Sequence, residues 1–299
     1  MCPRSNDAKI EGGLNGAYRR GMKVLCVGDG DMSFSLAVAK QVLDKNTSGE
    51  VSVVATSYED KPTLQRVYPN FDETLKSLRS YGGVEVGYKV DGTNLKDTLP
   101  DGLTNTTFHR ICWNFPCTAI SRGQDGQNAA MEENKELVRR FVSNSLPFLD
   151  RRCGEIHMIH KTKPPYNHWG LEKVALEKVG SQFEFKGKIV FDRCNLPPYV
   201  PRKALDRKSF PCHDACDHVF GWSGGGSDSS IPEAGTGADQ DDDISSIESE
   251  RIVKVTTNML ERVRAIHLRN QEVGAQRKKH ERTTRKGKGG QRSKRQRTK

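Results

Sequence analysis

The sequence predicts an α/β fold with a mainly parallel sheet, and three observations support this prediction. Segments with the composition of strands alternate with segments of helical spacing over roughly 200 residues. The strand at 23–27 runs through a glycine turn directly into a helical pattern. Acidic or polar side chains follow several strands, and in a parallel sheet these positions meet at one edge. The order of the elements therefore favours a doubly wound sheet with helices on both faces.

The predicted elements follow one another along the chain. Strands are expected at 23–27, 50–56, 84–90, 109–115, 155–160, 183–191 and 217–222. Helical spacing begins at Phe34 and recurs at 64–78, with an interruption at Pro69, and at 131–149 and 169–179.

The glycine turn at 28–31 is the first candidate site. In α/β folds such a turn lies beside a nucleotide-like ligand, because glycine lets the backbone approach closely and the following helix offers unpaired N–H groups. Ser33 replaces the third glycine of the dinucleotide fingerprint, which disfavours NAD. The carboxylates of Asp29 and Asp31 would repel a pyrophosphate and attract a sulfonium or an amine. This pattern points to S-adenosylmethionine, and the alternative is a tight turn without a ligand.

Acidic residues at the ends of the next two strands are further candidates. Glu59 and Asp60 follow the second strand, where nucleoside-binding folds place a carboxylate that accepts hydrogen bonds from the ribose hydroxyls. Asp91 follows the third strand and precedes a turn-forming glycine. For Asp91 a purely structural role is an equal alternative, and a surface-loop role is the alternative for Glu59 and Asp60.

The fourth strand ends in Asn114-Phe115-Pro116-Cys117. Proline cannot extend the hydrogen-bonded ladder, so the chain must leave the sheet here and expose Asn114 and the Phe115 carbonyl at its rim. Cys117 after proline also resembles the nucleophile of pyrimidine C5 methyltransferases, because a thiolate can add to ring carbon 6. The competing interpretation is that Cys117 is a small residue of the pocket wall.

The segments outside 22–222 differ strongly in composition. Residues 1–21 are expected to form a flexible arm, and 223–250, with eight acidic and no basic residues, a disordered linker. Apolar residues spaced by three and four predict an amphipathic helix at 251–270, and 271–299 forms a basic tail. Residues 277–299 contain twelve Lys or Arg and one acid, so that segment carries more than the whole net charge of +10. Such a tail is typical of binding to nucleic-acid phosphates and of nuclear or nucleolar targeting.

Cysteine usage and hydropathy suggest an intracellular, soluble protein. The eight cysteines show no paired spacing, and no apolar run approaches the roughly 18 residues that span a bilayer. The segment 212–218 (CHDACDH) holds four possible metal ligands, but structural zinc sites use two separated pairs, so we expect no metal.

Many short motifs in one order resemble the Rossmann-like domain of the large-subunit ribosomal RNA uracil-N3 methyltransferases, over roughly residues 22–208. They are 28–35 (GDGDMSFS), 55–58 (ATSY), Tyr68-Pro69, Val90-Asp91, Asn114-Phe115-Pro116, Asn134 with Leu137 and Phe141, 154–157 (GEIH), Lys161, Pro165-Tyr166, Trp169 and Pro198-Tyr199. The resemblance implies a seven-stranded class I methyltransferase domain that uses S-adenosyl-L-methionine. It also implies action on ribosomal RNA or pre-ribosomal particles in the nucleolus, in rRNA processing and ribosome biogenesis. The family usually has Glu in place of Asp29 and His in place of Cys117, and the second difference bears on catalysis.

These observations define roles for the candidate residues. The cofactor-binding set is predicted to comprise Gly28, Asp29, Gly30, Asp31, Ser33, Glu59, Asp60 and Asp91. The glycine turn and Ser33 would hold the methionine part, Glu59 or Asp60 the ribose, and Asp91 the adenine side. The candidate catalytic residues are Asn114, Phe115, Pro116, Cys117 and Lys161.

Methylation at N3 requires loss of the N3 proton, and Lys161 or Lys163 could stabilise the resulting anion. Because N3 lies on the pairing edge, the uridine must be unpaired or flipped out, and Tyr166 or Trp169 could stack on it. In the tail, Arg277, Lys278, Lys279, Arg285 and Lys286 are expected to contact RNA. We expect a monomer without a membrane partner. The alternative function is an inactive RNA-binding ribosome-assembly factor with the same fold.

Overall fold

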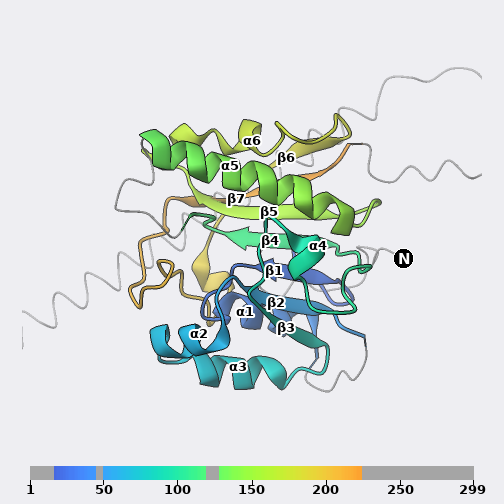
Figure 1. Cartoon of the computed structure of the whole chain (residues 1–299), viewed down its shortest axis with the longest axis vertical. Helices are drawn as coiled ribbons and strands as arrows, with labels where there is room; N and C mark the ends of the chain where they lie inside the picture. Colours follow the sequence, from blue (N-terminus) through green and yellow to red (C-terminus); the bar gives the residue numbers. More distant parts are fainter. Residues whose placement is uncertain (1–16, 45–49, 119–127, 224–299) are drawn as a thin grey trace, which may run out of the picture. The chain divides into compact units, whose positions relative to one another are not determined.

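The computed structural model describes residues 17–44, 50–118 and 128–223, which contain a seven-stranded sheet with helices on both faces (Figure 1). The strands are β1 (Val24–Val27), β2 (Val53–Ser57), β3 (Val84–Tyr88), β4 (Arg110–Asn114), β5 (Glu155–Lys161), β6 (Phe183–Val190) and β7 (Ala215–Trp222). Their order across the sheet is β3-β2-β1-β4-β5-β7-β6. Strand β7 runs antiparallel to β5 and β6, and the other neighbouring pairs are parallel. The predicted doubly wound, mainly parallel, seven-stranded fold is therefore confirmed.

The helices correspond to most of the predicted helical segments. They are α1 (Ser33–Val42), α2 (Lys61–Val67), α3 (Phe71–Arg79), α4 (Leu95–Thr98), α5 (Asn128–Ser145) and α6 (Leu171–Val174). The segment 64–78 divides into α2 and α3 around Pro69, as its interruption predicted. The predicted helix 169–179 is wrong in length, because α6 has only four residues and short turns surround it. Helix α4 was not predicted, since four residues carry too little periodicity.

Two hydrophobic cores lie on opposite faces of the sheet. Helices α1, α2 and α3 pack on one face together with Cys26 and Ala55. Helices α4, α5 and α6 pack on the other face with Leu25 and Val54. Consecutive strand residues point to opposite faces, so a strand covered on both sides must be apolar throughout. This arrangement explains why every residue of β1 is buried.

The folded domain begins before the predicted boundary at residue 22. Ala17 and Tyr18 are buried in the core on the α1 face, and the Tyr18 ring lies 6.1 Å from the Phe34 ring. The predicted flexible arm is therefore corrected at its end, because Tyr18 is too large an apolar surface to leave this core without cost. The amphipathic segment 251–270, the basic tail and all of the acidic linker except Ser223 lie outside the described residues. Within those residues, no helix has the length and apolarity needed to span a membrane.

Candidate functional site

A cavity of about 1170 Å³ lies at the carboxyl ends of the central parallel strands. Residues 27–31 after β1 and 113–118 around the end of β4 both line it. Strands β1 and β4 are hydrogen-bonded neighbours, with Val27 opposite Trp113, and the strand order reverses between them. Ligands of open α/β sheets bind at such a reversal point. The prediction that the glycine turn and the Asn-Phe-Pro rim line one hollow is confirmed.

The glycine turn packs directly against aromatic side chains. Gly28 has a φ of +67°, and a Cβ at this position would lie 2.6 Å from Nε1 of Trp113. A Cβ on Gly30 would lie 2.7 Å from the Tyr68 hydroxyl. Glycine is therefore required at 28 both for the left-handed backbone and for the close approach of the indole.

The two acidic residues of the turn are used differently. The Asp29 carboxylate accepts hydrogen bonds from the backbone N–H and the hydroxyl of Ser35, both at 2.7 Å, and is buried. Burial, together with the charge of Asp31, raises the pKa of Asp29 to about 7. Asp31 accepts from the Ser33 N–H at 3.1 Å and the Ser33 hydroxyl at 2.5 Å, and Nε of Arg202 lies 2.7 Å from its other oxygen. Ser33 is buried and does not line the cavity, so its visible role is to orient Asp31.

The structure separates the candidate acids that follow β2 and β3. Glu59 lines the cavity, whereas Asp60 does not and instead caps α2 by accepting the Thr63 N–H at 2.9 Å. Asp91 lines the cavity and also accepts the N–H and the hydroxyl of Thr93, both at 2.8 Å. Glu59 is therefore the better placed acid for a ligand, and Asp91 combines a turn contact with a position on the cavity wall.

The end of β4 turns sharply away from the sheet. Phe115 has a φ of +51°, and its N–H donates to the Ile159 carbonyl at 2.7 Å. A non-glycine residue in this region costs roughly 1–3 kcal/mol and persists where its surroundings enforce it. The Phe115 ring meets the Phe210 ring edge to face at 4.9 Å. Beyond Cys117, the Thr118 N–H donates to the side chain of the buried Asn134 on α5 at 2.7 Å.

The predicted catalytic residues Asn114, Phe115, Pro116, Cys117 and Lys161 all line this cavity. The Lys161 ammonium lies 5.0 Å from the centre of the Tyr166 ring and 5.1 Å from that of Phe210. Such cation–π contacts hold the charge at a fixed place beside the cavity.

His160 is a residue of the cavity wall that sequence reasoning missed. Its Nε2 donates to the Tyr166 carbonyl at 3.3 Å, and its ring lies 4.5 Å from the Trp169 ring. Burial, with the charge of His218, lowers the pKa of His160 to about 4, so the ring is neutral near pH 7. Tyr166 and Trp169 both line the cavity; Tyr166 is half-buried, whereas Trp169 is 2% exposed and serves mainly as packing.

A short hairpin at 201–210, here called the cover hairpin, was also missed. Its two arms form an isolated antiparallel bridge between Arg202 and Ser209. The Lys203 N–H donates to the Lys208 carbonyl at 3.2 Å, and the Phe210 N–H donates to the Pro201 carbonyl at 3.4 Å. The Arg207 guanidinium donates to the carbonyls of residues 66 and 67 at the end of α2. The segment lacks strand or helix periodicity, and the nearby signal was only the motif Pro198-Tyr199.

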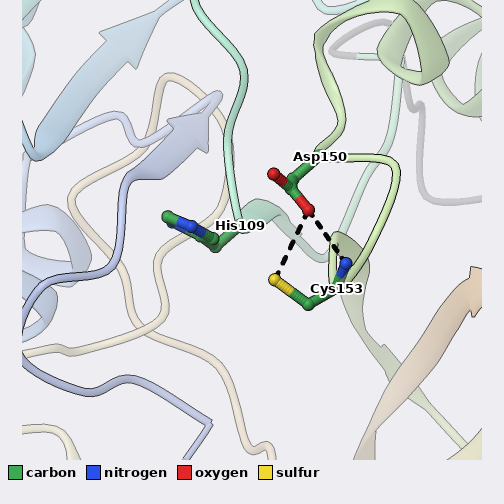
Figure 2. A group of neighbouring side chains, drawn as sticks. All are labelled: His109, Asp150 and Cys153. Atoms are coloured by element: carbon green, nitrogen blue, oxygen red, sulfur yellow. Dashed lines mark hydrogen bonds between the residues drawn. The ribbon is translucent and has the colours of Figure 1, made fainter. Parts of the chain in front are cut away.

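Other predicted residues fall outside this site. The basic residues Arg277, Lys278, Lys279, Arg285 and Lys286 lie outside the described residues. The potential ligands at 212–218 do not gather into a metal-binding group in the described part of the chain. A different group, His109, Asp150 and Cys153, comes together in the structure (Figure 2). These residues come just before β4 and β5, so the group lies at the opposite end of these strands from the cavity.

The group in Figure 2 does not suit a metal ion. Burial lowers the pKa of His109, and Nδ1 of this ring accepts the Lys23 N–H at 2.8 Å, so the proton of the neutral ring sits on Nε2. Asp150 accepts the N–H groups of Arg152 and Cys153, both at 2.9 Å. The Cys153 Sγ lies 3.4 Å from the same Asp150 oxygen (Figure 2), so that oxygen is already occupied by contacts within the turn. These residues stabilise the turn that enters β5.

Comparisons with known proteins agree with this geometry. The BMT5-like family model, described as "rRNA (uridine-N3-)-methyltransferase BTM5-like", matches residues 25–203. An uncharacterized protein of Arabidopsis thaliana is 30% identical over 209 residues, which are 68% of this chain and 94% of that protein. Heavy metal-associated isoprenylated plant protein 41 of the same organism is 28% identical over 204 residues, 68% of this chain but 36% of that protein.

Solved structures of methyltransferases are also similar. A putative methyltransferase from Thermoplasma acidophilum has 14% identity and a TM-score of 0.36, with 70% of this chain and 71% of that chain covered. A TehB-like SAM-dependent methyltransferase from Corynebacterium glutamicum has 16% identity and a TM-score of 0.38, with coverage of 70% and 85%.

Proposed function

This chain belongs to the BMT5-like family of rRNA (uridine-N3-)-methyltransferases, and we propose that it methylates N3 of a uridine in large-subunit ribosomal RNA, with S-adenosyl-L-methionine as methyl donor. The observation that carries the proposal is the single cavity that the glycine turn and the Asn114–Cys117 rim share. A donor held by the turn and a base held at the rim would meet in this space.

The cavity fits the cofactor in size and in chemistry. Its volume of about 1170 Å³ exceeds the roughly 300–1,000 Å³ of a pocket for one small ligand, which leaves room for a base as well. A Cβ at residue 28 would clash with the Trp113 indole, and both residues line the cavity, so the turn presents bare backbone there. Glu59 and Asp91 both line the cavity; the Glu59 carboxylate would accept the ribose hydroxyls, and Asp91 would contact the adenine side. When bound, S-adenosyl-L-methionine supplies an electrophilic methyl group on a sulfonium.

The residues at the rim suit a uracil base. Uracil presents an N–H at N3 between two carbonyl oxygens, and the Asn114 amide has both a donor and an acceptor for such an edge. N3 must lose its proton before it can attack a methyl group, and this proton would pass to solvent water. The Lys161 ammonium, fixed by Tyr166 and Phe210, would stabilise the negative charge that then develops on the base.

The target uridine must be accessible on its pairing edge. A flipped or unpaired base enters a pocket and stacks on aromatic side chains, and the half-buried Tyr166 ring is the candidate platform. Lys203 and Lys208 on the cover hairpin and Lys163 after β5 are exposed, and they supply positive charge for the adjacent phosphates. The basic segment 277–299 supports the further proposal of a nucleolar protein that binds pre-ribosomal RNA and acts in ribosome biogenesis.

Methylation in vitro, followed by nucleoside analysis, tests the reaction. The full chain is incubated with large-subunit rRNA transcripts and methyl-labelled donor, and the digested RNA is analysed by mass spectrometry against N3- and C5-methyluridine standards. We expect label in N3-methyluridine, lost in Asn114→Ala and retained in Cys117→Ala. Label in C5-methyluridine that disappears in Cys117→Ala would replace the proposal with the nucleophilic mechanism. Donor binding without label in any nucleoside would favour an assembly factor without turnover.

A further inference from the structure

An ion pair joins the cover hairpin to the glycine turn inside the cavity. Nε of Arg202 lies 2.7 Å from Oδ2 of Asp31, although the two residues are separated by 171 positions in the sequence. Both residues line the cavity, and their side chains are only 26% and 13% exposed. In such a partly buried place a charge interacts more strongly than on an open surface.

Both charged groups are held in place by other contacts. The second oxygen of Asp31 accepts from the N–H and the hydroxyl of Ser33. One terminal nitrogen of Arg202 donates to the Arg207 carbonyl at 2.6 Å. Among residues 17–44, 50–118 and 128–223, the other N–H groups of this guanidinium have no hydrogen-bond partner. The pair therefore presents unused donors and a fixed carboxylate beside the turn.

We propose that Arg202 and Asp31 bind the amino-acid end of the cofactor, with Arg202 on its carboxylate and Asp31 on its ammonium group. This inference rests on the function proposed above. The methionine part is a zwitterion, and Asp29 and Asp31 alone would repel its carboxylate. Of the described cationic residues that line the cavity (Arg140, Lys161, Arg202 and Lys203), Arg202 alone forms an ion pair with the turn. A planar guanidinium matches a carboxylate with two parallel hydrogen bonds, which an ammonium group cannot do.

A purely structural role for Arg202 makes a different prediction. The cover hairpin is also anchored by Arg207 on the end of α2 and by the contact of Phe210 with Phe115. Arg207 does not line the cavity. Arg207→Met is therefore a matched control, since it removes an anchor of the same hairpin without touching the proposed ligand group.

Two ligands that differ only in the amino-acid end test the assignment. Calorimetry on the full chain compares S-adenosylhomocysteine, which has that end, with 5′-methylthioadenosine, which lacks it. We expect Arg202→Met to weaken binding of S-adenosylhomocysteine by roughly ten- to a hundredfold and to leave binding of 5′-methylthioadenosine unchanged. Arg202→Lys should recover part of the loss, and Arg207→Met should bind both ligands as the wild type does.

The outcomes separate this inference from the proposed function. Equal weakening of both ligands by Arg202→Met, or no weakening of either, would overturn the assignment while the methyltransferase function stands. Failure of the wild-type protein to bind either ligand would overturn both. Far-UV circular dichroism tests whether each variant folds. If Arg202→Met does not fold, Arg202→Lys tests the assignment in its place: it must weaken binding of S-adenosylhomocysteine and leave binding of 5′-methylthioadenosine unchanged, or the assignment is wrong.

Discussion

A buried histidine should make the stability of this protein depend on pH. His157 on β5 is 2% exposed, and its Nδ1 lies 2.6 Å from a carboxylate oxygen of the fully buried Asp217 on β7. Its Nε2 lies 3.3 Å from Glu155, which in turn pairs with Arg110 of β4 at 2.8 Å. The Tyr18 ring packs against the imidazole at 6.1 Å. These contacts hold the antiparallel strand β7 against the parallel part of the sheet.

The magnitude follows from the pKa of His157. Burial alone would lower this pKa, but the Asp217 carboxylate and its hydrogen bond outweigh burial and raise the pKa from 6.5 to about 9. Because the folded state binds the proton more tightly, the stabilisation is complete below pH 6.5 and is lost as the pH rises to about 9. At about 1.4 kcal/mol for each pH unit, the loss is roughly 3 kcal/mol.

Urea unfolding at pH 6.5, 7.5 and 9 measures this loss. The wild-type free energy of unfolding should fall by about 3 kcal/mol more across this range than that of His157→Gln. Asp217→Asn, which removes the partner instead, should show the same flattening. Parallel pH profiles for the wild type and both variants would refute the reasoning, because they would show that His157 is not charged in the folded state.

Three further outcomes are expected. Gly28→Ala places a Cβ on a residue whose φ is +67° and which lies against the Trp113 indole, so the turn must shift. Calorimetry should show S-adenosylhomocysteine binding weakened by at least roughly tenfold. Unchanged affinity would contradict the role of the turn in cofactor binding. In the double variant Lys203→Ser, Lys208→Ser, the affinity for single-stranded RNA should depend less on salt: the negative slope of log affinity against log salt should become shallower by roughly 1.4. The control Lys76→Ser on α3 should keep the wild-type slope. A wild-type slope in the double variant would show that the hairpin does not contact RNA. Burial, with the charge of a neighbouring histidine, lowers the pKa of His160 to about 4, so the free energy of unfolding should fall as the pH falls from 6.5 towards 4. His160→Gln should reduce this fall in urea unfolding. An unchanged fall in the variant would show that another group titrates.

The sequence predicted the parts of this structure that depend on local pattern. Alternating or continuous apolar runs identified all seven strands, because burial on a sheet face leaves a direct trace in the order of residues. The shared cavity at Gly28 and Asn114 was also predictable. Parallel strands bring their carboxyl ends to one edge, and that geometry follows from the fold class alone.

The partner that each side chain takes, near or far in the sequence, could not be predicted in this way. Asp29 turns towards Ser35, Asp60 caps α2, and Ser33 serves Asp31, although each was a plausible ligand group by type and position. Acids at helix starts satisfy free N–H groups, and no spacing rule tells such a cap from a ligand. Arg202 reaches the turn across 171 residues through a hairpin without a periodic pattern, so its place became visible only in three dimensions.

Reverse-transcription mapping of ribosomal RNA from cells with and without the gene tests the central claim most directly. A methyl group at N3 blocks pairing and stops the polymerase, whereas a C5 methyl does not. We predict one stop in large-subunit rRNA that disappears on deletion, returns with the wild-type gene and does not return with Gly28→Arg. An unchanged pattern of stops after deletion would contradict methylation of a uridine at N3 by this protein.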